Sequence, residues 1–587
     1  MLVMASSSPP PNRIPASFDL DDSHLQTGPE GQLAHAGTLA HSDRLERKLW
    51  SPRPGVWSAV GNGLSNQNFV EGPEGLICID TGESNEEMAW SLAEVRKHTN
   101  APVAAVMYTH FHYVGGTRAI VDEAGRDLPI WGHRGIEGNL ERIGGEVSAA
   151  AQRGLVHQMA ILMPTEGPDA TVNLGLGKEF RHPDHAPYTR EVLLPTDTFD
   201  AEVALTIAGL ETVVTPAPSD ADDSVTIFFP ELGVAVNNIL WPTLFNVFAI
   251  RGEEYRDPRI LLTGLDHLQS LGAEHLVGAH GPPLSGGERI REDIEEYRDS
   301  IQFMWDQTVR GLNRGLTVDE LTEFVQLPTE YDRTYLTHQY YGLVEHHVRQ
   351  IHAGLRGWFD GHEALLFPES PVARVEKLIA GFGGADEVRR QAREALDTFD
   401  LRWALELATW LVRGEVNEHG RIDGGSAEDR NLLASVLRAI AQRTTSANVR
   451  NWCLTRALEL DGSLDLARFR VHRFSRSDVL SNRPEVYVRA LRVLLDPEKA
   501  VGINDHLRWE FADGTEVGLH VRRGVAVPTD GAGAELAIAL DLDTWAEIAS
   551  TKLAFSDAVG TGAITITGPE GRVRAVLASF DHATLSA

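Results

Sequence analysis

Cysteine is scarce in this sequence, and long apolar runs are missing from it. The 587 residues include only two cysteines, Cys78 and Cys453. Cys78 lies in an apolar run that is typical of a buried strand, so we expect a core thiol rather than a disulfide. No stretch reaches the ~18 apolar residues that a membrane span requires, and no basic segment followed by an apolar one marks a secretory signal. These absences predict a soluble cytoplasmic protein.

Basic residues are also few. The chain carries 53 Lys and Arg against 84 Asp and Glu, which gives a formal net charge of -31. Such a charge disfavours nucleic acid and anionic membranes as partners, because both are attracted to positive surfaces. An anionic substrate would therefore need local cations, from arginine or from a metal ion, to overcome the field of the whole protein.

The length and the periodicity of the chain predict several domains. A chain of 587 residues is too long for one hydrophobic core, so we expect about three domains. Residues 1–42 show no sustained period, which predicts an N-terminal tail. Short strands and helices alternate over 43–290, which indicates a layered α/β domain with a mixed sheet. The pattern over 291–465 is almost wholly helical, and short strands return over 466–587 in a small α+β domain.

The most informative stretch runs from Ala105 to Gly116. An apolar run ends in a threonine, which is followed by His110, Phe111 and His112 and, two residues later, by two glycines. On an extended segment this spacing puts both imidazoles on one face. Two neutral imidazoles with a carboxylate suit Zn²⁺ or Fe²⁺. We favour a metal site here over the alternative of two ordinary polar loop residues.

Two further loops at strand ends carry candidate ligands. One holds the acidic run from Asp220 to Asp223, and the other holds His280 beside a glycine. Taken singly, the acidic run is typical of a solvated turn and His280 of a structural residue. In α/β proteins, binding sites lie at the ends of strands. Because possible metal ligands occur at three strand ends here, we predict that they form one mononuclear metal site. That site would keep an open position for water or substrate.

Several motifs resemble those of known families. Asp80-Thr81-Gly82, the His110-Phe111-His112 motif and Ala279-His280 are similar to the metallo-β-lactamase fold. The downstream chain resembles the alkylsulfatases of the linear and secondary alkyl sulfate type in motifs that stand in the same order: Phe229-Pro230-Glu231-Leu232, Asn246, Ile250-Arg251-Gly252, Arg256-Asp257, Gly286-Gly287-Glu288-Arg289-Ile290, Tyr340-Tyr341-Gly342 and Gly357-Trp358-Phe359-Asp360-Gly361. This resemblance implies a metallo-β-lactamase αββα sandwich, an all-α domain that pairs two copies of the chain as a homodimer, and a C-terminal α+β domain similar to sterol carrier proteins.

The chain departs from the alkylsulfatase pattern at the metal ligands. The family motif T-H-x-H-x-D-H-x-G-G holds a second zinc through its Asp and its third His. Here His112 is followed by Tyr113 and Val114 and then directly by the two glycines. At the position of the family's first-metal glutamate, Asp220 is the best match and Asp223 is the second choice.

The family's bridging glutamate is missing as well. Asn238 stands at that position, and only His280 remains from the second metal site. A neutral amide cannot offset the repulsion between two dications. The sequence therefore predicts at most one tightly held divalent metal, with zinc expected and iron as the alternative.

The first of three candidate functions is a metal-dependent hydrolase of the alkylsulfatase type. It would act on a small molecule with an anionic head and an apolar part, such as an alkyl sulfate. Arg251, with Asn246, would bind the head group, since a guanidinium binds sulfate in a bidentate way. A structural salt bridge is the alternative role for Arg251. We expect Tyr113 to form a pocket wall rather than to act as an acid or base.

The other two functions belong to different classes. Two histidines and one aspartate with open positions resemble the facial triad of non-haem iron oxygenases, so the second function is an oxygenase or a metal-dependent lyase. The third is a non-catalytic binding protein, which the retention of His110, His112 and His280 disfavours. Metal content separates the third function from the others, and metal identity with oxygen dependence separates the first from the second.

Overall fold

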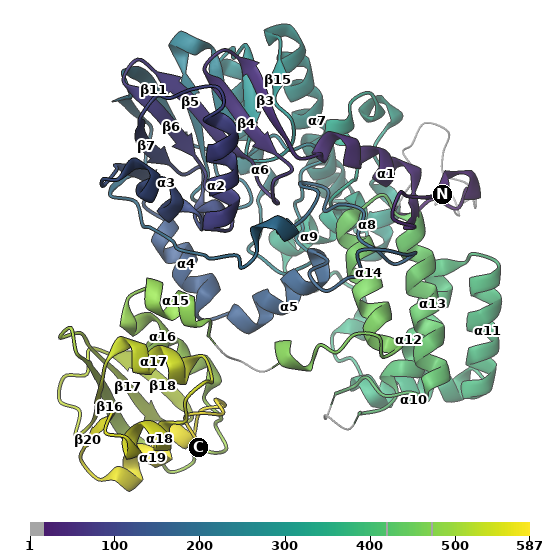
Figure 1. The fold of residues 1–587 in the computed structure, drawn as a ribbon. Coiled ribbons are helices and arrows are strands. Elements are labelled where there is room, and N and C mark those ends of the chain that lie inside the picture. The colour runs from purple at the N-terminus through teal and green to yellow at the C-terminus, as the bar shows by residue number, and fades with distance from the viewer. Residues whose placement is uncertain (1–16, 418–420, 471–473, 587) are drawn as a thin grey trace. The chain divides into compact units, whose positions relative to one another are not determined.

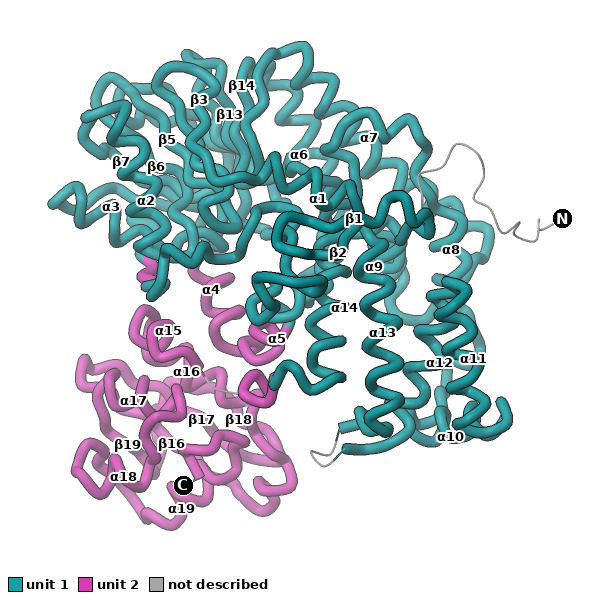
Figure 2. Tube along the Cα trace, turned by 45° about the vertical axis from the view of Figure 1, so that its right-hand side comes forward, with its two compact units in different colours: residues 1–134, 154–189, 193–465 teal, residues 135–153, 190–192, 466–587 magenta. Residues whose placement is uncertain are grey.

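The protein divides into two compact units. The computed structural model describes residues 17–417, 421–470 and 474–586 (Figure 1). Unit 1 comprises residues 1–134, 154–189 and 193–465, whereas unit 2 comprises 135–153, 190–192 and 466–587 (Figure 2). Unit 2 is thus assembled from three pieces of the chain.

Two mixed β-sheets form the α/β part of unit 1. The first sheet has seven strands in chain order: β3 (Lys48–Arg53), β4 (Val56–Val60), β5 (Gln67–Gly72), β6 (Gly75–Ile79), β7 (Val103–Met107), β8 (Ile130–His133) and β9 (Asp197–Phe199). The second has six, also in chain order: β10 (Val203–Ile207), β11 (Leu210–Pro216), β12 (Val225–Phe229), β13 (Val234–Asn237), β14 (His275–Gly278) and β15 (Leu284–Ser285). β7 lies parallel to both of its neighbours, β6 and β8.

The two sheets share one apolar layer. Ile77, Ile79 and Met107 of the first sheet belong to the same cluster of buried side chains as Val214 and Ile227 of the second. Strand β6 is buried along its whole length, which explains its continuous apolar sequence, since a strand covered on both faces shows no polar alternation.

Helices cover the outer faces of the two sheets. α2 (Asn85–Val95) and α3 (Thr117–Ala124) contact the first sheet, whereas α6 (Pro258–Ser270) and α7 (Gly287–Leu312) pack on the second (Figure 1). Ser84 begins α2 as its N-cap, because its hydroxyl accepts a hydrogen bond from the Glu87 backbone N–H. The order of layers is the metallo-β-lactamase αββα sandwich that the resemblance implies.

The chain beyond α7 is helical up to residue 460. Its helices are α8 (Val318–Phe324), α9 (Val344–Arg356), α10 (Pro371–Gly381), α11 (Ala385–Asp397), α12 (Leu401–Arg413), α13 (Ala427–Arg443) and α14 (Ala447–Leu460). Helices α11 to α14 pack consecutively against one another. The all-α region predicted from the sequence is confirmed. Ahead of the sandwich, the described part of the expected N-terminal tail forms a hairpin of β1 (Leu25–Thr27) and β2 (Leu33–His35), followed by α1 (Ala36–Ser42).

Unit 2 is an α+β structure. Its sheet has the order β18-β17-β16-β19-β20, formed by β16 (Asn504–Phe511), β17 (Glu516–Arg522), β18 (Val525–Thr529), β19 (Leu536–Leu540) and β20 (Thr565–Thr567). The accompanying helices are α4 (Ile136–Gly144), α15 (Arg476–Ser481), α16 (Pro484–Ala490), α17 (Leu542–Ala549), α18 (Phe555–Gly560) and α19 (Glu570–Ala578), and α5 (Ser148–Gln158) begins in this unit. Trp509 and Trp545 are fully buried in its core. The Arg483 guanidinium bonds the Glu141 carboxylate at 2.7 Å and ties the inserted helix α4 to the C-terminal piece.

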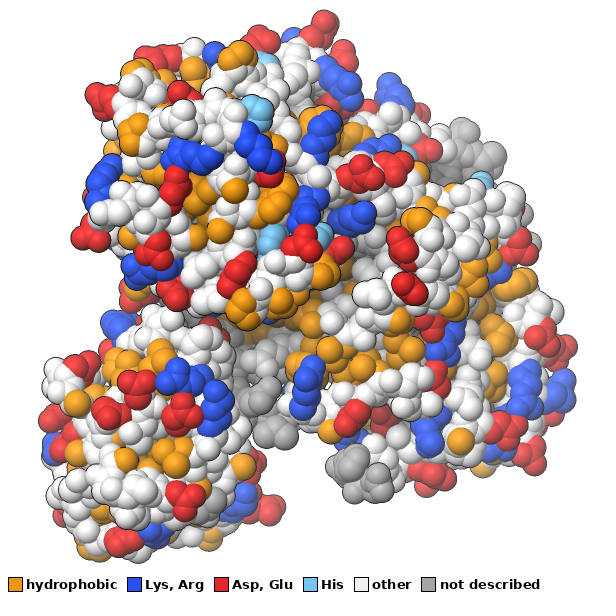
Figure 3. Space-filling model, in the orientation of Figure 1, with side chains coloured by type: hydrophobic (Ala, Val, Ile, Leu, Met, Phe, Trp, Pro, Cys, Tyr) orange, Lys and Arg blue, Asp and Glu red, His pale blue; other side chains and the backbone are white. Residues whose placement is uncertain are grey.

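The surface agrees with the composition. On the face shown in Figure 3, basic side chains are interspersed with acidic ones and do not gather into one basic area. No helix in the described ranges is both long enough and apolar enough to cross a membrane. Cys78 is a buried free thiol, as expected, and Cys453 is one as well.

Candidate metal centre

The His-x-His motif leaves the first sheet at the end of β7. The backbone N–H of Val225 on β12 donates to the Thr109 carbonyl at 2.9 Å, which fixes this segment against the second sheet. His110 is extended, with φ of -171°, and His112 lies in a single 3₁₀ turn, Phe111–Tyr113. The two imidazole rings meet edge to face with centroids 4.9 Å apart. Both rings therefore approach the same point, as the spacing predicts.

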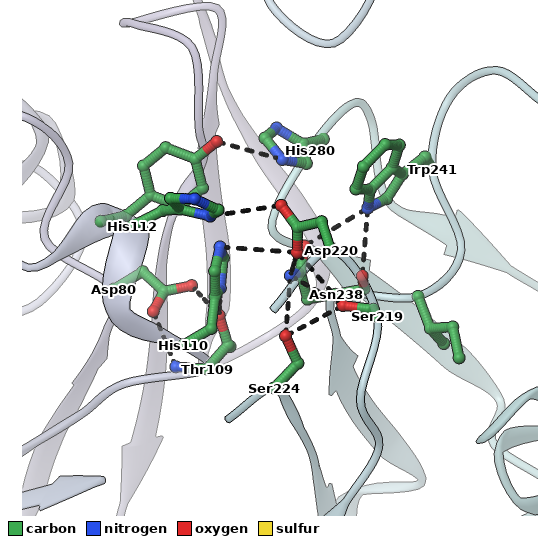
Figure 4. A network of polar contacts seen from close by, with 12 residues as sticks. Asp80, Thr109, His110, His112, Ser219, Asp220, Ser224, Asn238, Trp241 and His280 are labelled. Carbon is green, nitrogen blue, oxygen red and sulfur yellow. Dashed lines mark hydrogen bonds and ion pairs between the residues drawn. The ribbon is translucent and has the colours of Figure 1, made fainter. Parts of the chain in front are cut away.

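Asp220 completes a group of three converging side chains (Figure 4). It lies in the loop between β11 and β12. Its carboxylate oxygens are 3.9 Å from His110 Nε2 and 3.2 Å from His112 Nδ1. Within the described ranges, neither of these two nitrogens makes a hydrogen bond, although both are buried. Two orphaned imidazole nitrogens and a carboxylate are a donor set that fits one divalent metal ion.

A hydrogen-bond chain fixes the tautomer of His110. The Thr109 hydroxyl donates to Asp80 Oδ2 at 2.6 Å, and the Thr109 backbone N–H donates to Asp80 Oδ1 at 2.8 Å. Because that hydroxyl proton is already used, the Thr109 oxygen must accept from His110 Nδ1, which lies 2.8 Å away. The proton of His110 is thus held on Nδ1, and the Nε2 lone pair stays free for a metal.

Glu253 faces the outer ring nitrogen of His112, as Thr109 faces that of His110. Its carboxylate lies 3.5 Å from His112 Nε2 and is itself paired with the guanidinium groups of Arg251 and Arg256. Metal-ligating histidines commonly direct their second nitrogen at a carboxylate in this way. Sequence reasoning missed Glu253. The available signal is its place between two arginines, because Arg251 precedes it by two residues and Arg256 follows it by three.

The protonation of the group follows from burial and charge. Burial lowers the pKa of His110 to about 3, so this imidazole is neutral. Burial also disfavours protonated His112, but Asp220 and Glu253 outweigh it and raise the pKa to about 9. The pKa of Asp220 lies well below its usual value, because the nearby histidines outweigh the effect of burial. Without a metal, a proton on His112 offsets this buried carboxylate charge.

Asn238, the residue at the expected bridging position, acts as a hydrogen-bond donor. Its side-chain N–H groups donate to Asp220 Oδ1 at 2.6 Å and to the Ser219 hydroxyl at 3.1 Å. The Trp241 indole N–H donates to the Asn238 backbone carbonyl at 3.0 Å and to the side-chain Oδ1 at 3.3 Å. The amide therefore orients the carboxylate of Asp220. Unlike a glutamate at this position, it adds no second negative charge to the centre.

His280 and Tyr113 form a separate pair. His280 Nδ1 lies 3.0 Å from the Leu64 carbonyl oxygen, which can only accept, so the ring proton is on Nδ1. The remaining nitrogen, Nε2, accepts from the Tyr113 hydroxyl at 3.3 Å. Burial lowers the pKa of His280 to about 4, which keeps the ring neutral. His280 is thus outside the converging group. Asp223 is also buried and outside the converging group. The pKa of Asp80 is raised to about 7, first by the burial of Asp80 itself and then by the negative charges of Asp220 and Asp223.

Of the two residues expected at the anionic head group, Arg251 is linked directly to Glu253, which faces His112, and Asn246 is linked to Glu253 only through Arg256. Arg251 forms the salt bridge with Glu253, and its Nη1 also donates to the Tyr341 hydroxyl at 3.3 Å. Asn246 is fully buried, and its carboxamide has no hydrogen-bond partner in the parts of the chain that the structure describes. Its backbone carbonyl accepts from Arg256 at 2.7 Å. Arg251 is therefore coupled to the metal centre through Glu253.

A second cluster of possible ligands, Asp19, His24 and His35, is explained without a metal. His35 Nδ1 accepts a hydrogen bond from the Gly37 backbone N–H at 3.0 Å and so caps α1. The proton of neutral His35 must then be on Nε2, which faces Asp19 at 3.5 Å. This nitrogen has no lone pair to give to a metal unless the cap is broken.

Comparisons with known proteins agree with this geometry. A family model described as alkyl sulfatase dimerisation matches residues 317–463. A linear primary-alkylsulfatase from a Pseudomonas strain is 34% identical over 81% of this chain and 90% of its own length. An alkyl/aryl-sulfatase of Saccharomyces cerevisiae is 28% identical over 90% of this chain and 81% of its own. The solved structure of a stereoselective inverting sec-alkylsulfatase from Pseudomonas sp. superposes with a TM-score of 0.82 at 26% identity, covering 94% of this chain and 87% of that one. The chain belongs to the alkylsulfatase family.

Proposed function

We propose that this protein hydrolyses sulfate esters that carry an apolar alkyl chain, with one divalent metal held by His110, His112 and Asp220. The observation that carries the proposal is the convergence of two orphaned, buried imidazole nitrogens on one carboxylate in a member of the alkylsulfatase family. The relatives are named for linear primary and (R)-specific secondary alkyl sulfates. An alkyl sulfate is therefore the substrate class that we infer.

The surrounding residues prepare the three ligands. A divalent ion bound there would supply Lewis-acid stabilisation of negative charge and would acidify a water molecule. Thr109 holds the proton of His110 on the nitrogen away from the centre, and Glu253 faces the outer nitrogen of His112. The His112 side chain is 15% exposed, which supports an open side from which a small molecule reaches the centre.

Two observations support a single metal. The Nε2 lone pair of His280 is used by the Tyr113 hydroxyl, so it is not directed at a second ion. Asn238 presents N–H groups to Asp220, and an amide donor repels a cation where a bridging carboxylate would attract one. Zinc suits two imidazoles and a carboxylate, and iron is the alternative.

The anionic head group would bind near Arg251 and Asn246. Arg251 is a buried cation whose charge is only partly offset, because Glu253 pairs with Arg256 as well. The unpartnered carboxamide of Asn246 is a buried polar group that a ligand oxygen would satisfy. In a chain with a net charge of -31, these local donors supply what an anionic substrate needs.

The other parts of the chain have proposed roles of their own. The helices of residues 317–463, which match the dimerisation family, would pair two copies of the chain. The α+β unit formed mainly by residues 466–587 would be similar to sterol carrier proteins and would either bind the apolar chain of the substrate or stabilise the dimer.

Sulfate release tests the proposed hydrolysis. Purified protein is incubated with octan-1-yl sulfate and with each enantiomer of octan-2-yl sulfate, and free sulfate is measured with and without prior removal of metal by a chelator. We expect release that chelation abolishes and Zn²⁺ restores. Release that needs no metal would contradict the proposal. Oxygen consumption restored by Fe²⁺, without sulfate release, would favour the oxygenase instead.

A further inference from the structure

The hydroxyl oxygen of Tyr113 accepts no hydrogen bond from the part of the chain that the structure describes. Tyr113 is buried, and the partner of its hydroxyl in this part is His280 Nε2, at 3.3 Å. His280 Nδ1 keeps its proton against the Leu64 carbonyl, so Nε2 can only accept. The Tyr113 hydrogen is therefore committed to His280, and the lone pairs of the phenol oxygen are left unused.

The Tyr113 ring packs against both histidine ligands. It meets the ring of His110 edge to face, with centroids 5.0 Å apart, and its centroid lies 5.9 Å from that of His112. Burial, followed by the negative charge of Asp220, raises the pKa of Tyr113 well above its usual range. The hydroxyl is thus within electrostatic reach of the third ligand as well. The unused acceptor lies at the edge of the metal centre.

The backbone of Tyr113 is fixed by the loop that follows β6. The Tyr113 carbonyl accepts from the Thr81 backbone N–H at 2.8 Å and from the Thr81 hydroxyl at 3.2 Å. The backbone N–H of Gly116 donates to the same hydroxyl at 3.2 Å. A Cβ at Gly116 would be 2.3 Å from the Thr81 carbonyl oxygen, so only glycine allows the two segments to approach this closely. The position of the phenol is therefore set by the backbone on which it stands.

A second set of hydrogen bonds fixes the imidazole that holds the Tyr113 hydrogen. Asn66 is buried, and its amide N–H groups donate to the carbonyls of Gly278 at 2.9 Å and of Gly281 at 2.7 Å, one on each side of His280. Leu64 precedes Asn66 by two residues, so Asn66 joins the segment that carries the Leu64 carbonyl to the segment that carries His280. The tautomer of His280 is thus fixed by the fold.

We propose that the Tyr113 oxygen accepts a hydrogen bond from the water molecule that attacks the ester, and that His280 is the positioning residue that turns the Tyr113 hydrogen away from that water. An acceptor that holds one hydrogen of the water orients its lone pair towards the substrate, and such orientation lowers the barrier. Tyr113 neither gains nor loses a proton in this role. The inference rests on the proposed function, which supplies the ester.

The test compares two isoelectronic anions that bind to metal ions, one with a hydrogen and one without. Cyanamide binds as HNCN⁻, which carries an N–H, whereas cyanate carries no hydrogen. The protein is loaded with Co²⁺, whose visible absorption reports the Kd of each anion. Tyr113→Phe removes the acceptor, so it should raise the Kd of cyanamide by about 3- to 10-fold, the range for one hydrogen bond, and leave that of cyanate unchanged. Tyr340→Phe is the matched control, because the Tyr340 hydroxyl bonds His338 instead, and it should change neither Kd.

A double-mutant cycle tests the role of His280. His280→Ala frees the Tyr113 hydrogen, which can then point at the bound anion. Relative to wild type, cyanate should bind more tightly and cyanamide less tightly, and both changes should vanish in the Tyr113→Phe background. Equal changes of both Kd values in Tyr113→Phe, or loss of Co²⁺ from that variant, would overturn the inference, because the phenol would then act through packing.

Hydrolysis of octan-1-yl sulfate by the Zn²⁺-loaded protein gives the second measurement. Tyr113→Phe should lower kcat by about 10- to 100-fold at unchanged KM, because the orientation of the water affects the reaction and not the binding of the ester. If wild type releases no sulfate, the proposed hydrolysis fails, and the selectivity between the two anions still shows whether Tyr113 accepts a hydrogen bond at the metal. If wild type hydrolyses the ester and Tyr113→Phe keeps the wild-type kcat, the inference fails and the proposed function stands.

Discussion

The histidines of the centre fall into two groups that differ in how they use their ring nitrogens. His110 and His112 each direct one nitrogen at a protein partner, Thr109 for the first and Glu253 for the second. Each leaves the other nitrogen facing Asp220 without a hydrogen bond in the described structure. For neutral His110 this is unfavourable, because an unpaired buried polar atom costs roughly 1–3 kcal/mol, whereas His112 without a metal is protonated and pairs with Asp220 at 3.2 Å. A bound metal would remove that cost.

His280 stands at an equivalent strand end and behaves differently. Both of its nitrogens are satisfied, one by the Leu64 carbonyl and one by the Tyr113 hydroxyl. All three histidines follow apolar strands, and His110 is as fully buried as His280, so neither feature decides which of them faces the metal site. The difference teaches that the second contact of a histidine, and not its place in the sheet, decides whether it is prepared to bind a metal.

The largest effect is expected when the carboxylate shared by His110 and His112 is removed. Asp220→Ala deletes a ligand and leaves two buried imidazoles without a counter-charge, so the protein should lose its metal. Sulfate release should fall by on the order of 10²- to 10³-fold. Elemental analysis and the sulfate assay check this. Asp222→Ala, an exposed neighbour in the same acidic run, is the control, and an equal loss there would contradict the assignment.

A smaller effect is expected at the group that faces His112 from outside. Glu253→Gln keeps the size of the side chain but removes the charge near His112, so the affinity for Zn²⁺ should fall about 10- to 100-fold. Metal titration against a competing chelator measures this. The same change leaves Arg251 and Arg256 without their shared carboxylate, which should also lower thermal stability. Glu254→Gln, at the exposed next position, should change neither quantity.

A partly buried carboxylate outside the converging group shows how ordinary pairing differs from metal binding. Glu345 at the start of α9 bonds Arg402 of α12 at 2.6 and 3.0 Å. Burial would raise the pKa of Glu345, but Arg402 lowers it to about 2 in the folded protein. Since the folded pKa lies below the usual one, the pair stabilises the fold above about pH 4.5, and this contribution is lost as the pH falls towards 2.

The Glu345→Gln variant therefore tests whether the stability contribution of this pair decreases as the pH falls. At pH 7 it should lower the free energy of unfolding by roughly 2 kcal/mol, and the difference from wild type should shrink between pH 5 and about pH 2. Chelation of metal should not alter the difference. Denaturant unfolding across this pH range is the measurement, with the exposed Glu376→Gln as control. A difference that grows at low pH would contradict the assignment.

The smallest effect on metal content is expected at His280. His280→Gln removes an imidazole whose nitrogens are both used by the protein, so the metal content of the variant should equal that of the wild type. His110→Gln, the matched change at a nitrogen that faces Asp220, should lose the metal. If His280→Gln loses metal as His110→Gln does, the contrast between the two groups of histidines is wrong.

The two histidines of the centre could be predicted from the sequence because their signal is local: their spacing after an apolar strand fixes the directions of both side chains. The choice of Asp220 over Asp223 came instead from the resemblance to the alkylsulfatases. A layered α/β domain and the helical region were predictable for a similar reason, since periods of two and 3.6 residues are read within short windows. The αββα order of the layers came from the resemblance to known families and not from these periods.

The residues that hold the ligands and their neighbours in place could not be predicted from the sequence, because their partners are remote in the chain. His112 meets Glu253, and Gln158 meets Tyr341, and nothing near either residue indicates the contact. The pairing of Tyr113 with His280 is equally remote, although Tyr113 itself was singled out. Residues 135–153 belong to unit 2 and contact residues more than 300 positions later, as in the Arg483–Glu141 pair, which no local pattern reveals.

The measurement that tests the central claim most directly is the number of metal ions per chain. The protein is purified without added metal and without oxygen, and its metals are quantified by elemental analysis against the protein concentration. The account predicts one divalent ion per chain, held by His110, His112 and Asp220. Two tightly held ions per chain would contradict it, because the second would have to displace Tyr113 from His280.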